Sequence, residues 1–119
     1  MCFAAVIDNN VIAACVFQRR SHTSFELMNI AVQPAYQTQG TGSKLLAYAI
    51  AEIKYKGVKI IELGTGAFGH QLSFYQKLGF RVESVIKNHL LENYPKPIFE
   101  NGIQHKDMLR LTLHLKDIT

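Results

Sequence analysis

This chain of 119 residues lacks the features that mark several specialised classes of protein. It has no low-complexity tract, no secretory signal and no apolar run as long as a membrane span. Its only two cysteines, Cys2 and Cys15, lie in apolar runs without the spacing of a metal or redox pair. We therefore expect free, buried thiols in a reducing cytoplasm and no membrane partner.

Clusters of charge and of metal ligands are also absent from the sequence. The net charge of +4 suits an anionic ligand, but the lysines and arginines are spread along the chain. They do not form a basic stripe with interleaved aromatic residues, so we expect no nucleic-acid partner. The five histidines are scattered, with no pair four residues apart, and we predict no metal site.

The pattern of apolar runs and turns predicts a mixed order of strands and helices. Strands are expected at 2–7, 11–18 and 24–32, the first two joined by the turn residues Asp8-Asn9-Asn10. A helix with one apolar face follows Gly42 and ends at Gly57. The further predicted elements are a strand at 58–63, a loop at 64–69, a helix at 71–78, and strands at 80–86 and 108–115. This order, βββ-α-β-α-ββ, predicts one α+β domain over residues 1–119.

The most informative stretch is residues 32–43, between the third strand and the first helix. Within it, Gln37 to Gly42 form a turn with two glycines, which lets the backbone approach a ligand closely. Free N–H groups and the positive end of the helix dipole make such a turn a binding site for anions. The alternative is a tight strand-to-helix connection without a ligand.

Three motifs at these spacings make the chain resemble the GCN5-related N-acetyltransferase (GNAT) superfamily. They are Val32-x-Pro34, Gln37-x-x-Gly40-x-Gly42 and Phe74-Tyr75-x-Lys77-x-Gly79-Phe80. The stretch from Asn93 to Gly102 is similar to that of a little-characterised bacterial subgroup. The resemblance spans about Phe3 to Leu115. It implies the acyl-CoA N-acyltransferase fold, a three-layer α+β arrangement with a mixed, mostly antiparallel sheet, flanking helices and splayed central strands.

The resemblance implies an enzyme that transfers acetyl from acetyl-CoA, its co-substrate, to a primary amine by direct attack in a ternary complex. Amides of the turn and the helix start would bind the CoA pyrophosphate. Backbone groups of the third strand would pair with the pantetheine arm and the acetyl carbonyl. The residues implied for cofactor binding are Ile30, Ala31, Val32, Gln37, Thr38, Gln39, Gly40, Thr41, Gly42, Ser43 and Tyr75.

Two side chains are candidates for proton transfer. Tyr75 matches the family's tyrosine acid, and a phenol can donate to the departing CoA thiolate. The alternative is that Tyr75 only packs on the apolar face of its helix. Glu26, a lone carboxylate in an apolar strand, is the candidate general base, and its alternative is a solvent-facing position. His22 and Glu92 are weaker candidates for the base.

The chain departs from the family pattern in two places. Phe68 and Gln71 stand where many members carry an asparagine and an alanine, so no asparagine role is carried over to this chain. Members normally have a strand and one or two helices before the hairpin at 2–18, and this chain starts at the hairpin. The sheet face that this layer would cover favours self-association, so we expect a homodimer.

Residues 87–107 form a long connection, which in a compact domain is usually functional or disordered. Tyr94 and Phe99, with Glu92 and Glu100, suit a cationic acceptor, and we predict a small-molecule amine. The alternative for this segment is packing against a second subunit. The alternative for the whole chain is a non-catalytic acyl-CoA-binding or assembly protein that has lost its acceptor chemistry.

Overall fold

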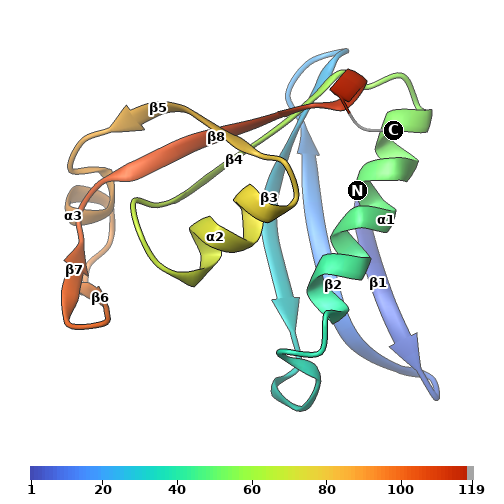
Figure 1. The fold of residues 1–119 in the computed structure, drawn as a ribbon, viewed down its shortest axis with the longest axis horizontal. Helices are drawn as coiled ribbons and strands as arrows, with labels where there is room; N and C mark the ends of the chain where they lie inside the picture. The colour runs from blue at the N-terminus through green and yellow to red at the C-terminus, as the bar shows by residue number, and fades with distance from the viewer. Residues whose placement is uncertain (118–119) are drawn as a thin grey trace. The chain divides into compact units, whose positions relative to one another are not determined.

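The computed structural model describes residues 1–117, which form two compact units. The first unit holds residues 1–61 and the C-terminal end from His114, and the second holds residues 62–113. Figure 1 labels the elements of both units. The single-domain organisation expected from the sequence stays a prediction.

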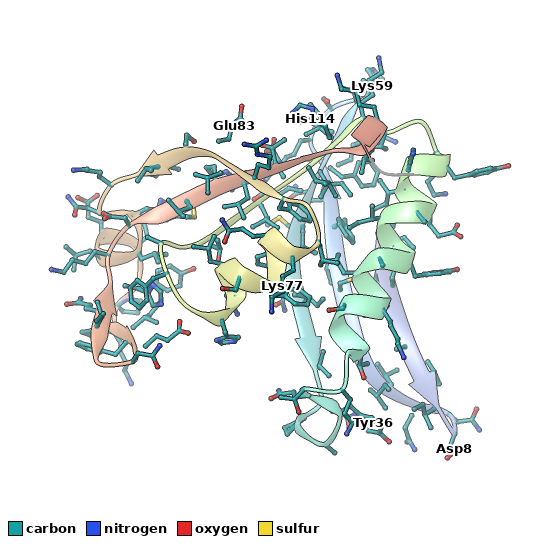
Figure 2. All side chains as sticks on the ribbon, viewed as in Figure 1. Asp8, Tyr36, Lys59, Lys77, Glu83 and His114 are labelled. Atoms are coloured by element: carbon teal, nitrogen blue, oxygen red, sulfur yellow. The ribbon has the colours of Figure 1, made fainter. Side chains whose placement is uncertain are left out.

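The first unit is built on three antiparallel strands. β1 (Cys2–Ile7), β2 (Asn10–Arg19) and β3 (Ser24–Val32) pair in chain order. Asp8 and Asn9 both have positive φ, which gives the two-residue turn whose twist suits a hairpin. Asp8 lies at the tip of this hairpin (Figure 2). The predicted hairpin and third strand are therefore confirmed.

A single helix covers one face of these strands. The short helix η1 (Pro34–Tyr36) leads to α1 (Thr41–Tyr55), which lies along β1 and β2 in Figure 1. The apolar side chains of α1 recur every three or four residues, so one stripe is buried and the opposite one is exposed. The buried residues of α1 are Leu45, Leu46, Ala49, Ile50 and Ile53.

The ends of two other elements complete the first unit. The backbone N–H groups of Lys59 and Ile60 both donate to the carbonyl of Thr23, at 2.8 and 3.0 Å. The N–H of Leu115, the first residue of η2 (Leu115–Asp117), donates to the carbonyl of Lys59 at 2.8 Å. These hydrogen bonds replace the bonds to water that the backbone N–H and C=O groups lose on folding.

The second unit holds a sheet in the order β4-β8-β5. β4 (Ile60–Gly66) enters from the first unit, and β8 (Met108–His114) lies between it and β5 (Arg81–Ile86). β5 and β8 are antiparallel. The helix α2 (His70–Lys77) follows β4, and the buried apolar side chains of this unit are Leu63, Tyr75, Phe80, Leu111 and Leu113.

The long connection after β5 is folded. It contains α3 (His89–Asn93) and a hairpin of β6 (Ile98–Glu100) and β7 (Ile103–His105), which Figure 1 shows gathered beyond the end of β5. Asn101 and Gly102 both have positive φ and form the two-residue turn between β6 and β7. The predicted order of elements lacks these three elements.

Two further expectations differ from the structure. The strand predicted at 58–63 is β4, Ile60–Gly66, so the first half of the predicted loop at 64–69 is strand. Glycine lowers strand propensity, but here the neighbouring strand β8 supplies the pairing that overrides it. Cys15 is buried as expected, whereas Cys2 is exposed, because it is at the end of the edge strand β1.

We predict that Leu46→Ala destabilises the protein by about 3 kcal/mol, because Leu46, on the buried face of α1, is fully buried and its truncation leaves a cavity. Tyr55→Ala, at the exposed end of the same helix, is the matched control and should change stability by less than about 0.5 kcal/mol. Denaturant unfolding of both variants measures the difference. Equal losses would show that α1 does not carry the core of its unit.

Candidate functional site

The start of α1 in the first unit has the geometry of an anion site. The residue before the helix, Gly40, has φ 80°, a left-handed conformation that glycine adopts without strain. Thr38, also left-handed at φ 64°, makes a second tight bend in the same loop. No side chain caps the helix, and its first turn holds no acidic residue. The first N–H groups of Thr41, Gly42 and Ser43 are therefore suited to binding an external anion.

Two glutamine side chains hold the loop before α1. The side-chain amide of Gln37 donates to the carbonyl of Val32 at 3.0 Å, and that of Gln39 donates to the carbonyl of Ala35 at 3.0 Å. Tyr36 lies in the same loop (Figure 2). Both glutamines thus fix the backbone of the turn. Their predicted part in binding the cofactor, like that of the other turn residues, stays a prediction.

The third strand changes its register just before the residues expected to bind pantetheine. Asn29 pairs with Val16, but the next pair is Leu27 with Phe17, so Met28 is an extra residue in β3. Such a bulge twists the strand that carries it and re-aims the residues beyond it. The residues beyond it, Ile30, Ala31 and Val32, pair with Cys15, Ala14 and Ala13 of β2.

Glu26, the candidate base, is engaged in an ion pair within the first unit. The guanidinium of Arg20 lies 2.6 Å from its carboxylate, and its Nε donates to the same oxygen at 2.7 Å. The Glu26 side chain is only 13% exposed. The solvent-facing alternative is therefore a poor description of this residue, although its role as a base stays a prediction.

Tyr75 lies on α2 in the second unit and is buried. Its ring contacts those of Phe74 and Phe80 in edge-on geometry, with centroids 5.3 and 5.9 Å away. Burial raises the pKa of the Tyr75 phenol above its ordinary value near 10. The hydroxyl is therefore protonated at neutral pH, which is the state that a proton donor needs.

A pocket of about 610 Å³ lies within the second unit. This volume is in the range of sites for small molecules. Its walls come from the end of β4, the loop after it, the start of α2, α3, and the β6–β7 hairpin. The lining includes the apolar residues Phe68, Leu90, Tyr94, Ile98, Phe99 and Met108, and the polar residues Thr65, His70, Gln71, Glu100, Asn101 and His105.

The carboxylate of Glu100 joins the hairpin to the start of α2. One oxygen accepts the backbone N–H and the Nδ1–H of His70, both at 3.0 Å, and the other accepts from Nε2 of His105 at 3.0 Å. The ring of His105 stacks on Phe68 with centroids 4.0 Å apart. These hydrogen bonds, chiefly that from His105, lower the pKa of Glu100 from 4.5 to about 2. Glu100 is therefore an anion throughout the neutral range.

Two glycines make room for these side chains. A Cβ on Gly66 would lie 2.5 Å from the ring of His105, and one on Gly69 would collide with the carboxylate of Glu100. Gly69 also has φ 105°, which other residues rarely adopt. The glycines in residues 64–69 thus allow the hairpin to pack closely on the β4–α2 connection.

The structure distributes the predicted residues over both units. Glu26 and residues 30–43 belong to the first unit, and Tyr75 belongs to the second. Sequence reasoning singled out Glu100, Tyr94 and Phe99 but missed His70 and His105 as pocket residues. The Asn101-Gly102 turn was the available signal, because it predicts a hairpin that pairs Ile98 with His105.

The cluster around Glu100 is a hydrogen-bonded network. Within residues 1–117, no three His, Cys, Asp or Glu side chains are arranged to hold a metal ion. No helix in the described part of the chain is long and apolar enough to cross a membrane.

Comparison with known proteins identifies the family. The sequence model of the acetyltransferase (GNAT) domain matches residues 1–82. The chain is 40% identical over 115 residues to the uncharacterised N-acetyltransferase YvbK of Bacillus subtilis, covering 96% of this chain and 74% of YvbK. These matches confirm the resemblance drawn from the three motifs.

Two further matches are a solved structure and a relative named for its substrate. A GNAT family acetyltransferase from Elizabethkingia anophelis, solved with acetyl-CoA bound, superposes with a TM-score of 0.87 at 40% identity, over 93% of this chain and 73% of that one. The ribosomal protein bS18-alanine N-acetyltransferase of Haemophilus influenzae is 34% identical over 77% of this chain and 60% of its own length. The predicted α+β fold with a mixed, mostly antiparallel sheet is confirmed.

We predict that Glu100→Gln lowers the melting temperature at pH 6 and that its deficit relative to the unaltered protein shrinks as the pH falls from 4.5 toward 2. The pKa of Glu100 is lowered in the folded state, so its stabilisation is present above pH 4.5 and is lost as the carboxylate is protonated. Thermal melts of both proteins between about pH 2.5 and 7 measure this. A deficit that does not change with pH would show that the charge of Glu100 contributes nothing.

Proposed function

The chain belongs to the GNAT acetyltransferase family, and we propose that it transfers the acetyl group of acetyl-CoA to the primary amine of a small molecule. The observation that carries the proposal is the uncapped start of α1 behind the left-handed Gly40. Its N–H groups and the dipole of a 15-residue helix favour the CoA pyrophosphate at this position.

Backbone groups of β3 supply the second part of the proposed cofactor site. Main-chain groups near Ile30 and Val32 would pair with the pantetheine amides and the acetyl carbonyl, in the role that the family resemblance implies. The bulge at Met28 supports this role, because a bulge bends and twists its strand and is common next to active sites.

The chemistry requires two protons to leave the acceptor. An ammonium first gives one proton to a base, and the neutral nitrogen then attacks the thioester carbon. As the C–N bond forms and the C–S bond breaks, a donor protonates the CoA sulfur, and the second amine proton then replaces the proton that this donor has lost. Tyr75 is the proposed donor to that sulfur, and its burial in a protonated state supports this. Glu26 is the base predicted from the sequence, but Arg20 already occupies its carboxylate.

A protein amine is the second candidate acceptor. It is favoured by the similarity to an enzyme named for acetylating an alanine of ribosomal protein bS18. The pocket of the second unit favours a small molecule, because its volume and its aromatic lining suit a compact ligand. The cytoplasmic location and the homodimer expected from the sequence stay predictions.

We predict that Gly40→Asp weakens acetyl-CoA binding at least tenfold, because it places a negative charge at the proposed pyrophosphate site. Gly57→Asp is the matched control. Gly57 lies just beyond the other end of α1 and has a similar φ of 86°, and at both glycines an added Cβ would meet no atom within 4 Å. Calorimetric titration with acetyl-CoA measures both variants. Equal affinity for Gly40→Asp and the unaltered protein would overturn the proposed cofactor site.

We predict that Tyr75→Phe lowers kcat by about 100-fold and leaves acetyl-CoA affinity within about twofold, because only the donated proton is lost. Release of CoA thiol in the presence of a panel of primary amines measures turnover, and calorimetry measures affinity. If the unaltered protein binds acetyl-CoA and acetylates nothing in the panel, the non-catalytic acyl-CoA-binding alternative is supported instead.

A further inference from the structure

The imidazole of His70 is held in one defined protonation pattern by Glu100. An ionised carboxylate can only accept hydrogen bonds, so the Nδ1 atom of His70 that lies 3.0 Å from it carries the proton. The lone pair of the neutral ring is then on Nε2. The side chain of His70 is 84% exposed and lines the pocket, so this atom is accessible to a ligand.

Glu100 orients His70 and cannot itself be the base. Its two oxygens accept three hydrogen bonds from His70 and His105, and its low pKa means that it takes up no proton near neutral pH. A carboxylate beside Nδ1 fixes the ring tautomer and stabilises the imidazolium that forms when Nε2 accepts a proton. This is the arrangement of a base and its orienting partner.

The aromatic residues that line the pocket suit a ligand with a flat, apolar group and a positive charge. Phe99 and Tyr94 line the pocket with about half or more of their surfaces exposed, and Phe68 adds a third ring. The faces of these rings attract a cation as well as an aromatic group. Among the described residues that line the pocket there is no lysine or arginine, so the carboxylate of Glu100 sets its charge.

We propose that this pocket binds a primary amine that carries a flat, apolar group, and that Nε2 of His70 accepts the proton of its ammonium. The assignment rests on the proposed acetyl transfer and supplies the proton acceptor that Glu26, paired with Arg20, is poorly placed to be. The proton taken by His70 passes to solvent after each turnover. The second amine proton restores the phenol of Tyr75 after that group has protonated the CoA sulfur.

Three other ionisable side chains line the pocket with His70. Glu100 is charged, His105 lies on its other oxygen, and the phenol of Tyr94 is the remaining titratable group in the lining.

The kinetic test uses tryptamine as the acceptor. His70→Gln should lower kcat at pH 7 by about 100-fold, because the base is lost. KM for tryptamine should change by less than about threefold, because the aromatic residues that line the pocket are unaltered. The deficit should narrow above about pH 9, where free amine is abundant without a base. Glu100→Gln should lower kcat by a smaller factor. His114→Gln, an exposed histidine of the first unit, should have no effect.

The outcome separates a proton acceptor from a structural residue. The His70 side chain is 84% exposed and the backbone N–H of residue 70 keeps its bond to Glu100, so His70→Gln should lower the melting temperature less than Glu100→Gln does. An unchanged kcat, or a deficit that stays constant from about pH 6 to pH 10, would overturn the assignment of His70. A deficit that disappears at high pH supports it.

The binding test needs no turnover. Nitrogen-detected NMR of the histidines should show His70 protonated at Nδ1, and tryptamine should shift its signals without acetyl-CoA. Tryptophol, which has a hydroxyl in place of the ammonium, and ethylamine, which has no ring, should each bind at least tenfold more weakly. If other amines are acetylated and tryptamine does not bind, the pocket assignment is wrong and the proposed function stands. If tryptamine binds in the presence of bound acetyl-CoA and is not acetylated, the role of His70 as proton acceptor is wrong. The proposed acetyl transfer is then also wrong for tryptamine as the acceptor.

Discussion

The architecture of the second unit depends on the carboxylate of Glu100. It accepts the backbone N–H at the start of α2, where no side chain of the helix itself provides a cap, and it accepts a ring N–H from His105 in the neighbouring strand. A negative charge at this end of a helix is also favoured by the helix dipole. This side chain, together with the stacking of His105 on Phe68, attaches the β6–β7 hairpin to the β4–α2 connection, and residues of both segments line the pocket.

The start of the helix in the first unit differs from the start of α2, because no side chain accepts its free N–H groups. The start of α1 is left without a cap or an acidic residue, so its N–H groups remain suited to an external anion. The surrounding loop is nevertheless held, because Gln37 and Gln39 bond back to backbone carbonyls. The protein supplies its own anion, the carboxylate of Glu100, to α2, whereas the proposed function requires α1 to receive the phosphates of a cofactor.

Local sequence patterns predicted most of the elements, and they singled out Tyr94, Phe99 and Glu100, which line the pocket. The Asp8-Asn9 turn, the apolar stripe of α1 and the motif around Tyr75 each depend on near neighbours in the chain. The features that were not predicted depend on contacts between residues far apart in the sequence. His70 and Glu100 are thirty residues apart, and nothing in either local pattern shows that Gly69 leaves room for a carboxylate from the hairpin. β4 extends through Gly64 and Gly66 because β8 pairs with it, which overrides their low strand propensity.

Glu26 and Glu100 differ in whether the partner of each carboxylate still has a lone pair that can accept a proton. Arg20 carries no lone pair, so the ion pair of Glu26 ends at a cation that cannot accept a proton. His70 can, because the hydrogen bond to Glu100 uses Nδ1 and leaves Nε2 with a lone pair. A carboxylate too acidic to serve as a base therefore still contributes by fixing which ring nitrogen of its neighbour keeps a lone pair. A paired carboxylate can therefore take part in proton transfer only if its partner keeps an atom with a lone pair, as His70 does and Arg20 does not.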